Sequence, residues 1–149
     1  MRKILIKNDL DELSAAAAGL FVAVALESIA LRGSFSVALA GGSTPRALYS
    51  LLASDKYRQK VNWSKVNFFF GDERNVPADS DESNYRMANE TFLSPLRIHP
   101  SSVHRWQTEL GPSEAAADSG KSPYPVRLRR IVFQSSDNLF RAADIVPSW

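Results

Sequence analysis

Two short apolar segments, each followed by a polar loop rich in glycine or charge, constrain the fold of this chain more than any other feature. Residues 35–40 (Phe-Ser-Val-Ala-Leu-Ala) and 66–70 (Val-Asn-Phe-Phe-Phe) have the length and composition of buried strands. Between them, residues 47–52 carry leucines at helical spacing. A strand, a helix and a second strand in this order predict a right-handed βαβ unit in an α/β fold. We expect the two strands to be parallel, and adjacent or one strand apart, in a single sheet.

Capping signals divide the rest of the chain. Asp9, with Glu12 three residues later, is typical of a helix start, and Gly33 is placed to end that helix in a left-handed conformation. Ser83 is a second candidate N-cap. The other predicted elements are a strand at residues 2–7, helices at about Leu10–Leu31 and Asn84–Leu93, a short strand at 103–106 and the start of a helix at 112–118.

The composition is that of one globular domain and excludes several kinds of site. Of 149 residues, 44% are hydrophobic and 23% are charged, which argues against wholesale disorder. The absence of cysteine removes disulfides, thiolate nucleophiles and cysteine-bound metals. His99 and His104 are the only histidines, so we expect no histidine-rich metal site. We interpret both as surface or structural residues, and we expect no metal and no cofactor.

Charge and hydropathy argue against nucleic acid and membrane partners. Residues 1–118 carry 13 basic and 14 acidic side chains, whereas residues 119–149 carry five and two. The body of the protein therefore lacks the basic surface that nucleic acid requires. The apolar stretch at 15–25 is shorter than the ~20 residues that span a bilayer, and acidic rather than basic residues precede it. We interpret it as a buried helix of a cytoplasmic protein.

The loop at residues 41–46 (Gly-Gly-Ser-Thr-Pro-Arg) has the features of an anion site. Glycines allow a ligand to approach the backbone, and the free N–H groups of a helix start attract negative charge. The Ser43 and Thr44 hydroxyls can add hydrogen bonds, and Arg46 adds positive charge. The alternative is an ordinary glycine turn, with Ser43 or Thr44 as the N-cap and Pro45 at the first helical position.

The loop at residues 71–74 (Gly-Asp-Glu-Arg) follows the second strand, so it should lie at the same carboxyl edge as the first loop. Ligands of open α/β sheets bind at that edge. Asp72 and Arg74 are therefore candidate site residues. The alternative is an ion pair between Asp72 and Arg74 that ties down the following loop.

In their order and spacing, these loops resemble the 6-phosphogluconolactonase family. The resemblance covers residues 1 to about 118, roughly the first half of a family member. The matching segments are 40–49 (Ala-Gly-Gly-Ser-Thr-Pro-Arg-Ala-Leu-Tyr), 70–77 (Phe-Gly-Asp-Glu-Arg-Asn-Val-Pro) and 81–85 (Asp-Glu-Ser-Asn-Tyr), with further likeness at 96–106 and 112–117.

The resemblance implies a doubly wound, Rossmann-like parallel sheet, shared with glucosamine-6-phosphate deaminases. It implies hydrolysis of 6-phosphoglucono-δ-lactone to 6-phosphogluconate in the pentose phosphate pathway, without a cofactor. The sister deaminases have tyrosine where this chain has Arg74, which favours the lactonase, and Arg74 is expected near the phosphate. The implied substrate-binding residues are Gly41, Gly42, Ser43, Thr44, Arg46, Asp72 and Arg74.

The family's general base is a histidine in a Gly-x-Asp-Gly-His motif, which this sequence does not contain. The catalytic residue is therefore unassigned, and neither histidine takes that role. We expect residues 1–118 to be the N-terminal part of a lactonase-like domain, truncated there, and residues 119–149 to be a poorly ordered or irregular tail. The partner is a small sugar phosphate, and we expect a monomer. The alternatives are a non-catalytic fragment with residual sugar-phosphate binding and a deaminase-like isomerase.

Overall fold

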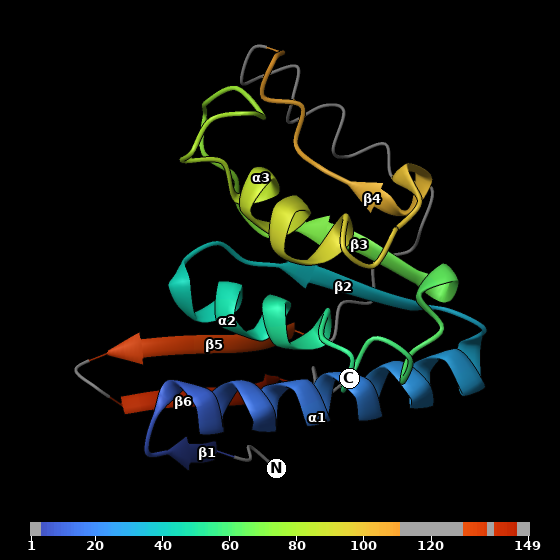
Figure 1. Ribbon diagram of the computed structural model, residues 1–149, viewed down its shortest axis with the longest axis vertical. Coiled ribbons are helices and arrows are strands. Elements are labelled where there is room, and N and C mark those ends of the chain that lie inside the picture. The colour runs from blue at the N-terminus through green and yellow to red at the C-terminus, as the bar shows by residue number, and fades with distance from the viewer. Residues whose placement is uncertain (1–3, 111–129, 137–138, 146–149) are drawn as a thin grey trace.

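A three-stranded parallel sheet forms the centre of the protein (Figure 1). The computed structural model describes residues 4–110, 130–136 and 139–145. Strand β3 (Val66–Phe70) lies between β2 (Phe35–Leu39) and β4 (Val103–His104), and both neighbours are parallel to it. The register pairs Val37 with Phe68. The parallel α/β core and the adjacency of its first two strands are thus confirmed, and the strand expected at 103–106 is two residues long.

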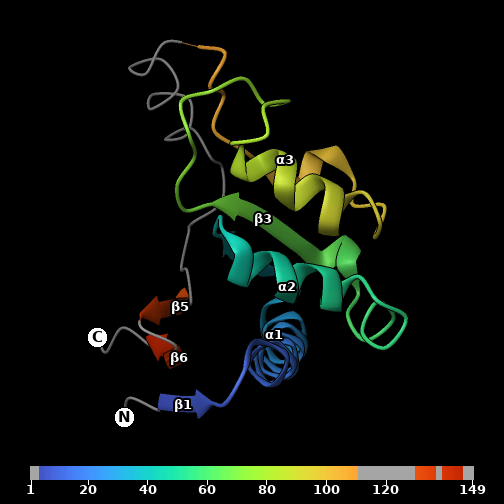
Figure 2. The ribbon, with the colours of Figure 1, turned by 60° about the vertical axis from the view of Figure 1, so that its left-hand side comes forward.

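Helices connect these strands as the βαβ pattern predicts. Helix α2 (Ser43–Leu52) lies between the parallel sheet and the long helix α1 (Leu10–Arg32), as Figures 1 and 2 both show. The N-terminal and C-terminal signals of α1 are confirmed: the Asp9 carboxylate accepts a hydrogen bond from the Glu12 N–H, and Gly33 adopts φ 77°. The helices are α1 (Leu10–Arg32), α2 (Ser43–Leu52) and α3 (Asn84–Ala88), which continues as the π-helix η2 (Asn89–Leu93), with 3₁₀ turns η1 (Trp63–Lys65) and η3 (Pro100–Ser102).

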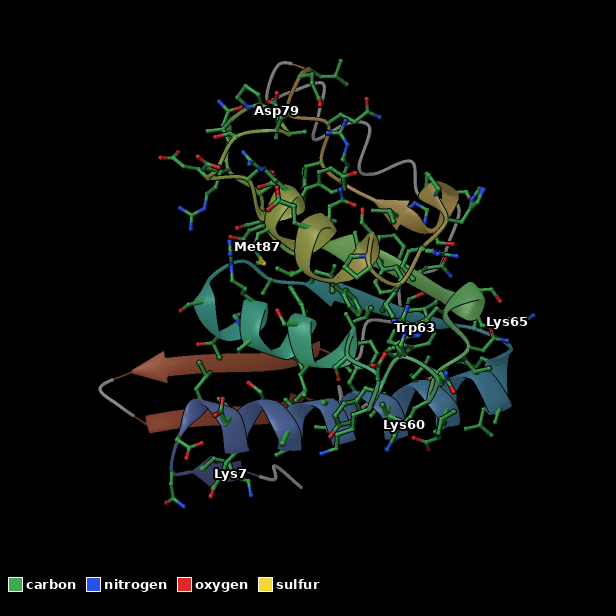
Figure 3. All side chains as sticks on the ribbon, viewed as in Figure 1. Lys7, Lys60, Trp63, Lys65, Asp79 and Met87 are labelled. Carbon is green, nitrogen blue, oxygen red and sulfur yellow. The ribbon has the colours of Figure 1, made fainter. Side chains whose placement is uncertain are left out.

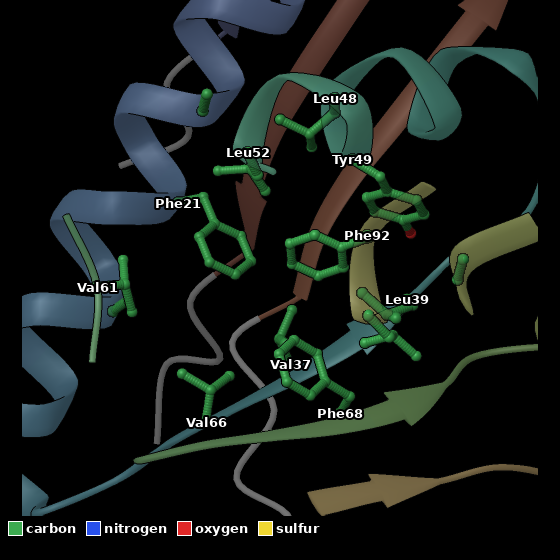
Figure 4. Close-up of a cluster of buried hydrophobic side chains, with 14 of the residues drawn as sticks. Phe21, Val37, Leu39, Leu48, Tyr49, Leu52, Val61, Val66, Phe68 and Phe92 are labelled. Atoms are coloured by element: carbon green, nitrogen blue, oxygen red, sulfur yellow. The ribbon is translucent and has the colours of Figure 1, made fainter. Parts of the chain in front are cut away.

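The hydrophobic core lies between the helices and one face of the sheet (Figure 4). Alternate residues of β2 and β3 are buried on this face, as the two-residue period of a strand requires. Phe92 of η2 is fully buried at its centre. The centre of its ring lies 5.4 Å from the ring centre of Tyr49, 5.5 Å from those of Phe68 and Trp63, and 6.5 Å from that of Phe21. The π-helix therefore supplies the residue on which several elements converge.

Helix α1 is apolar on nearly all sides but is buried on only one. Its buried residues include Leu13, Ala18 and Phe21, whereas Leu26 and Leu31 are 50% and 71% exposed. Among the described residues, α1 is also the one helix long and apolar enough to cross a membrane. A core helix passes the same test, and the packing of α1 against α2 and β2 supports that interpretation.

A second, antiparallel sheet contains the first strand and the end of the chain. Strand β1 (Ile4–Lys7) pairs with β6 (Leu139–Ile145), which also pairs with β5 (Arg130–Ser136). The structure here differs from the irregular tail expected over residues 119–149. The pairing satisfies backbone N–H and C=O groups of β5 and β6. The sequence of this region does not show the alternation of apolar and polar residues that would have predicted strands. The helix expected at 112–118 lies outside the described residues.

Candidate functional site

The two loops meet at the carboxyl edge of the parallel sheet. The Gly71 N–H donates to the Leu39 carbonyl oxygen at 3.0 Å, which extends the pairing of β2 and β3 into the second loop. Beside this contact is a pocket of about 540 Å³, and Met87 of α3 lies on its wall near the start of α2 (Figure 3). The lining residues are Gly42, Ser43, Arg46, Arg74, Asp81, Glu82, Ser83, Asn84 and Met87.

The start of α2 has no side-chain cap. Gly42 is the N-cap residue, with φ 105° and ψ 174°, and the helix begins at Ser43. The predictions that Ser43 or Thr44 caps the helix and that Pro45 is its first residue are therefore wrong, since Pro45 is third. Glycine at a positive φ makes the turn itself, and the first N–H groups of α2 have no partner within the helix. Such a helix start favours an anion.

Glu73, rather than an ion pair between Asp72 and Arg74, ties down the second loop. Among the described side chains Asp72 and Arg74 form no ion pair. The Glu73 carboxylate instead accepts hydrogen bonds from the N–H groups of Asn84 and Tyr85, at 2.7 and 2.8 Å, and from the hydroxyl of Ser83 at 3.3 Å. The loop is therefore attached to the start of α3, and the Asp72–Arg74 alternative is wrong.

Asn84 connects the two loops. Its side chain is 6% exposed, and its Nδ2 donates to the Asp72 carbonyl oxygen at 3.2 Å. The same amide group fills the space next to Gly41, where a Cβ atom would overlap it. Glycine at position 41 is thus required by the close approach of Asn84. This contact fixes the distance between the first loop and α3.

The charges of the pocket are only partly compensated. Arg46 and Arg74 are exposed and form no ion pair with a described side chain. Asp81, in contrast, pairs with Arg86 at 2.8 Å, and Arg86 also pairs with Glu90 at 2.7 Å. The hydrogen bond that Arg86 donates to Glu90 raises the pKa of Arg86 most, followed by the negative charge of Asp81. Two arginines therefore remain to attract an anion.

The structure brings together four of the seven predicted site residues in the lining of the pocket: Gly42, Ser43, Arg46 and Arg74. Gly41, Thr44 and Asp72 belong to the same loops but are not part of that lining. Sequence reasoning did not assign a role to Glu73, because a long loop separates it from the helix start that its carboxylate contacts. The sequence offered no reason to place Met87 in the pocket, because its apolar side chain is equally typical of the core.

Neither histidine lines the pocket, as the sequence predicts. The Nδ1 atom of His99 lies 2.7 Å from the Ser101 hydroxyl and accepts from the Ser101 N–H, so it caps η3. His104 stacks on Phe69 with ring centres 4.5 Å apart, and burial lowers its pKa.

The buried hydroxyl of Tyr49 holds the end of β2. It donates a hydrogen bond to the carbonyl oxygen of Ala40 and accepts one from the Ala40 N–H, both at 2.9 Å. Burial raises the pKa of Tyr49.

Comparison with known families agrees with this geometry. A family model described as glucosamine-6-phosphate isomerases/6-phosphogluconolactonase matches residues 8–132. The chain belongs to this family. The match includes both loops of the pocket and all the elements of the parallel sheet.

Several members of the glucosamine-6-phosphate isomerase/6-phosphogluconolactonase family are similar to this chain. The 6-phosphogluconolactonase of Thermotoga maritima is 45% identical over 82 residues, which are 55% of this chain and 35% of the relative. The chloroplastic 6-phosphogluconolactonase 3 of Arabidopsis thaliana is 36% identical over 113 residues, which are 76% of this chain and 32% of that relative. The solved 6-phosphogluconolactonase structure from Trypanosoma brucei has a TM-score of 0.70 and 32% identity, covering 88% of this chain and 51% of that one. The chain thus spans a third to a half of these relatives.

Proposed function

We propose that this chain is a 6-phosphogluconolactonase, which binds the phosphate of 6-phosphoglucono-δ-lactone in the pocket between α2 and α3. The observation that carries the proposal is that Arg46 and Arg74, which form no ion pair with a described side chain, both lie beside the start of α2, which has no side-chain cap. Charge-assisted hydrogen bonds to phosphate are among the stronger ones in proteins. The names of the relatives supply the substrate class.

All seven residues predicted from the sequence take part in binding the sugar phosphate in this proposal. Ser43 and Thr44 supply N–H and hydroxyl donors, Gly41 and Gly42 allow the close approach, and Asp72 lies next to the sugar. The product, 6-phosphogluconate, belongs to the pentose phosphate pathway. We also propose a monomeric, cytoplasmic protein, although some of the relatives are chloroplastic.

Hydrolysis of the lactone needs a base that activates water and donors that stabilise the oxyanion. General-base catalysis contributes about 10²–10⁴-fold. The only histidines are His99 and His104, and both are engaged outside the pocket lining. We therefore expect the 149-residue chain to bind sugar phosphate and to accelerate lactone hydrolysis little, which keeps the non-catalytic alternative open.

Binding is tested by titrating the chain with 6-phosphogluconate. Arg74→Ala should weaken binding by about tenfold, as loss of a charge-assisted hydrogen bond predicts. The matched control is Lys65→Ala, which removes an exposed positive charge at the other end of β3 (Figure 3) and should leave the affinity unchanged. Equal affinities of the two variants would remove Arg74 from the site.

Catalysis is tested by release of 6-phosphogluconate above the spontaneous rate, with protein free of host lactonase. Turnover close to that of a full-length family member would contradict our account of the missing base. An isomerase-type activity is tested in parallel with glucosamine 6-phosphate. Turnover of that substrate would favour the deaminase-like alternative.

A further inference from the structure

We propose that Glu73 is the positioning residue of the pocket: its carboxylate fixes both the loop that carries Arg74 and the helix start that carries Asn84. The inference rests on the proposed sugar-phosphate site, because it concerns how that site is held ready. Glu73 does not line the pocket, so it acts through its neighbours.

The carboxylate accepts four hydrogen bonds, one from its own loop and three from the start of α3. Oε1 accepts from the N–H groups of Arg74 and Asn84, at 2.8 and 2.7 Å. Oε2 accepts from the Tyr85 N–H at 2.8 Å and the Ser83 hydroxyl at 3.3 Å. All four groups are donors, so the site suits an ionised carboxylate, which has about four acceptor positions and no proton to place.

These bonds connect Glu73 to both sides of the pocket. One holds the backbone of Arg74, whose exposed side chain has no ion-pair partner of its own among the described residues. Another holds the backbone of Asn84, whose side chain packs against Gly41 and bonds the Asp72 carbonyl oxygen. The loop between them, residues 74–83, is thereby closed at both ends by one side chain.

Glu73→Gln keeps the shape but replaces one acceptor oxygen with an NH₂ group that faces N–H donors. The loop then loses its attachment, and ordering Arg74 becomes a cost of binding. We expect the affinity for 6-phosphogluconate to fall about three- to tenfold. In the Glu73→Gln background, Arg74→Ala should weaken binding by only about one- to threefold instead of about tenfold, because Arg74 is no longer held in place.

The control separates positioning from general stability. Asp9→Ala removes a carboxylate N-cap from α1 at a residue that does not line the pocket, and should lower the melting temperature without changing the affinity. If Glu73→Gln binds 6-phosphogluconate as tightly as Asp9→Ala does, or if Arg74→Ala costs the same in both backgrounds, the proposal is overturned. If Glu73→Gln does not fold, Glu73→Asp, which keeps the charge and shortens the reach, replaces it and should also lose affinity.

Amide hydrogen exchange distinguishes failure of this inference from failure of the proposed function. The N–H groups of Asn84 and Tyr85 should exchange slowly in the wild type and faster in Glu73→Gln, with or without ligand. Faster exchange supports the attachment even if 6-phosphogluconate does not bind, in which case only the proposed function fails. Equal exchange rates in the two proteins would refute the role of Glu73.

Discussion

Replacing Gly41 by alanine should destabilise the protein through a single steric contact. The Gly41 backbone is in van der Waals contact with the Asn84 amide group, and an added Cβ would overlap three of its atoms. Asn84 is 6% exposed and is held between the two loops, so the added methyl group must displace it. The variant must therefore move Asn84 away from the first loop and break its hydrogen bond to the Asp72 carbonyl oxygen.

The magnitude follows from these two effects. Overpacking of a filled site costs about 1–3 kcal/mol, and the lost hydrogen bond adds ~0.5–1.5 kcal/mol. We expect Gly41→Ala to lower the free energy of unfolding by about 2–4 kcal/mol, which is roughly 5–15 °C in melting temperature for a domain of this size. The affinity for 6-phosphogluconate should fall with it, because Asn84 lines the pocket.

Urea denaturation of Gly41→Ala measures the effect, and the chain offers a matched control. Gly19 lies within α1 with no atom within 4 Å of an added Cβ, so Gly19→Ala should stabilise the protein by ~0.5–1 kcal/mol through helix propensity. In the double variant Gly41→Ala/Asn84→Ala the overlapping atoms are absent. Asn84→Ala should therefore lower the free energy of unfolding less in the Gly41→Ala background than it does in the wild type. Wild-type stability of Gly41→Ala, or strict additivity of the pair, would refute the steric argument.

Three further predictions concern the core, a helix end and pH. Phe92→Ala should lower the free energy of unfolding by about 3–5 kcal/mol, because Phe92 is fully buried; a loss below ~1 kcal/mol in urea would contradict its central place. Gly33→Ala should cost ~1 kcal/mol, since Gly33 has φ 77°, and an unchanged melting temperature would contradict this. Burial lowers the pKa of His104 below its ordinary 6.5, so the unfolded chain binds more protons in that range. The free energy of unfolding should therefore be highest above about pH 6.5 and should decrease as the pH is lowered below that value. His104→Phe should reduce this pH dependence of stability. If the stabilities of the two proteins change with pH in parallel, His104 does not cause the dependence.

The sequence predicted the parts of the fold that depend on local pattern. Strands β2 and β3 have buried residues at every second position, and a helix between them leaves one handedness of connection. Asp9 and Gly33 mark the ends of α1 through backbone chemistry that needs no distant partner. That the two loops meet followed from the parallel strands, and four of the seven residues named from the sequence line the pocket there.

The remainder depended on contacts between distant segments. Glu73 is separated from Asn84 and Tyr85 by about ten residues of loop, so only the folded chain shows that its carboxylate reaches their N–H groups. Strands β5 and β6 are paired with each other and with β1 from the opposite end of the sequence. The Pro45 prediction failed because the conformation of Gly42, rather than a capping hydroxyl, decides where α2 begins.

The π-helix at Asn89–Leu93 has a consequence for changes in chain length. Its wider turn, in which the Ser94 N–H donates to the Asn89 carbonyl oxygen at 2.9 Å, holds one residue more than an α-helical turn of the same span. Deleting one residue within this turn would let the segment close into an α-helix of the same span, so the residues that follow it would keep their orientation. Deleting one residue from the regular turns of α1 would instead rotate every later residue of that helix by about 100° and turn its buried face away from the core. A single-codon deletion should therefore be tolerated better at Asn89–Leu93 than in the middle of α1.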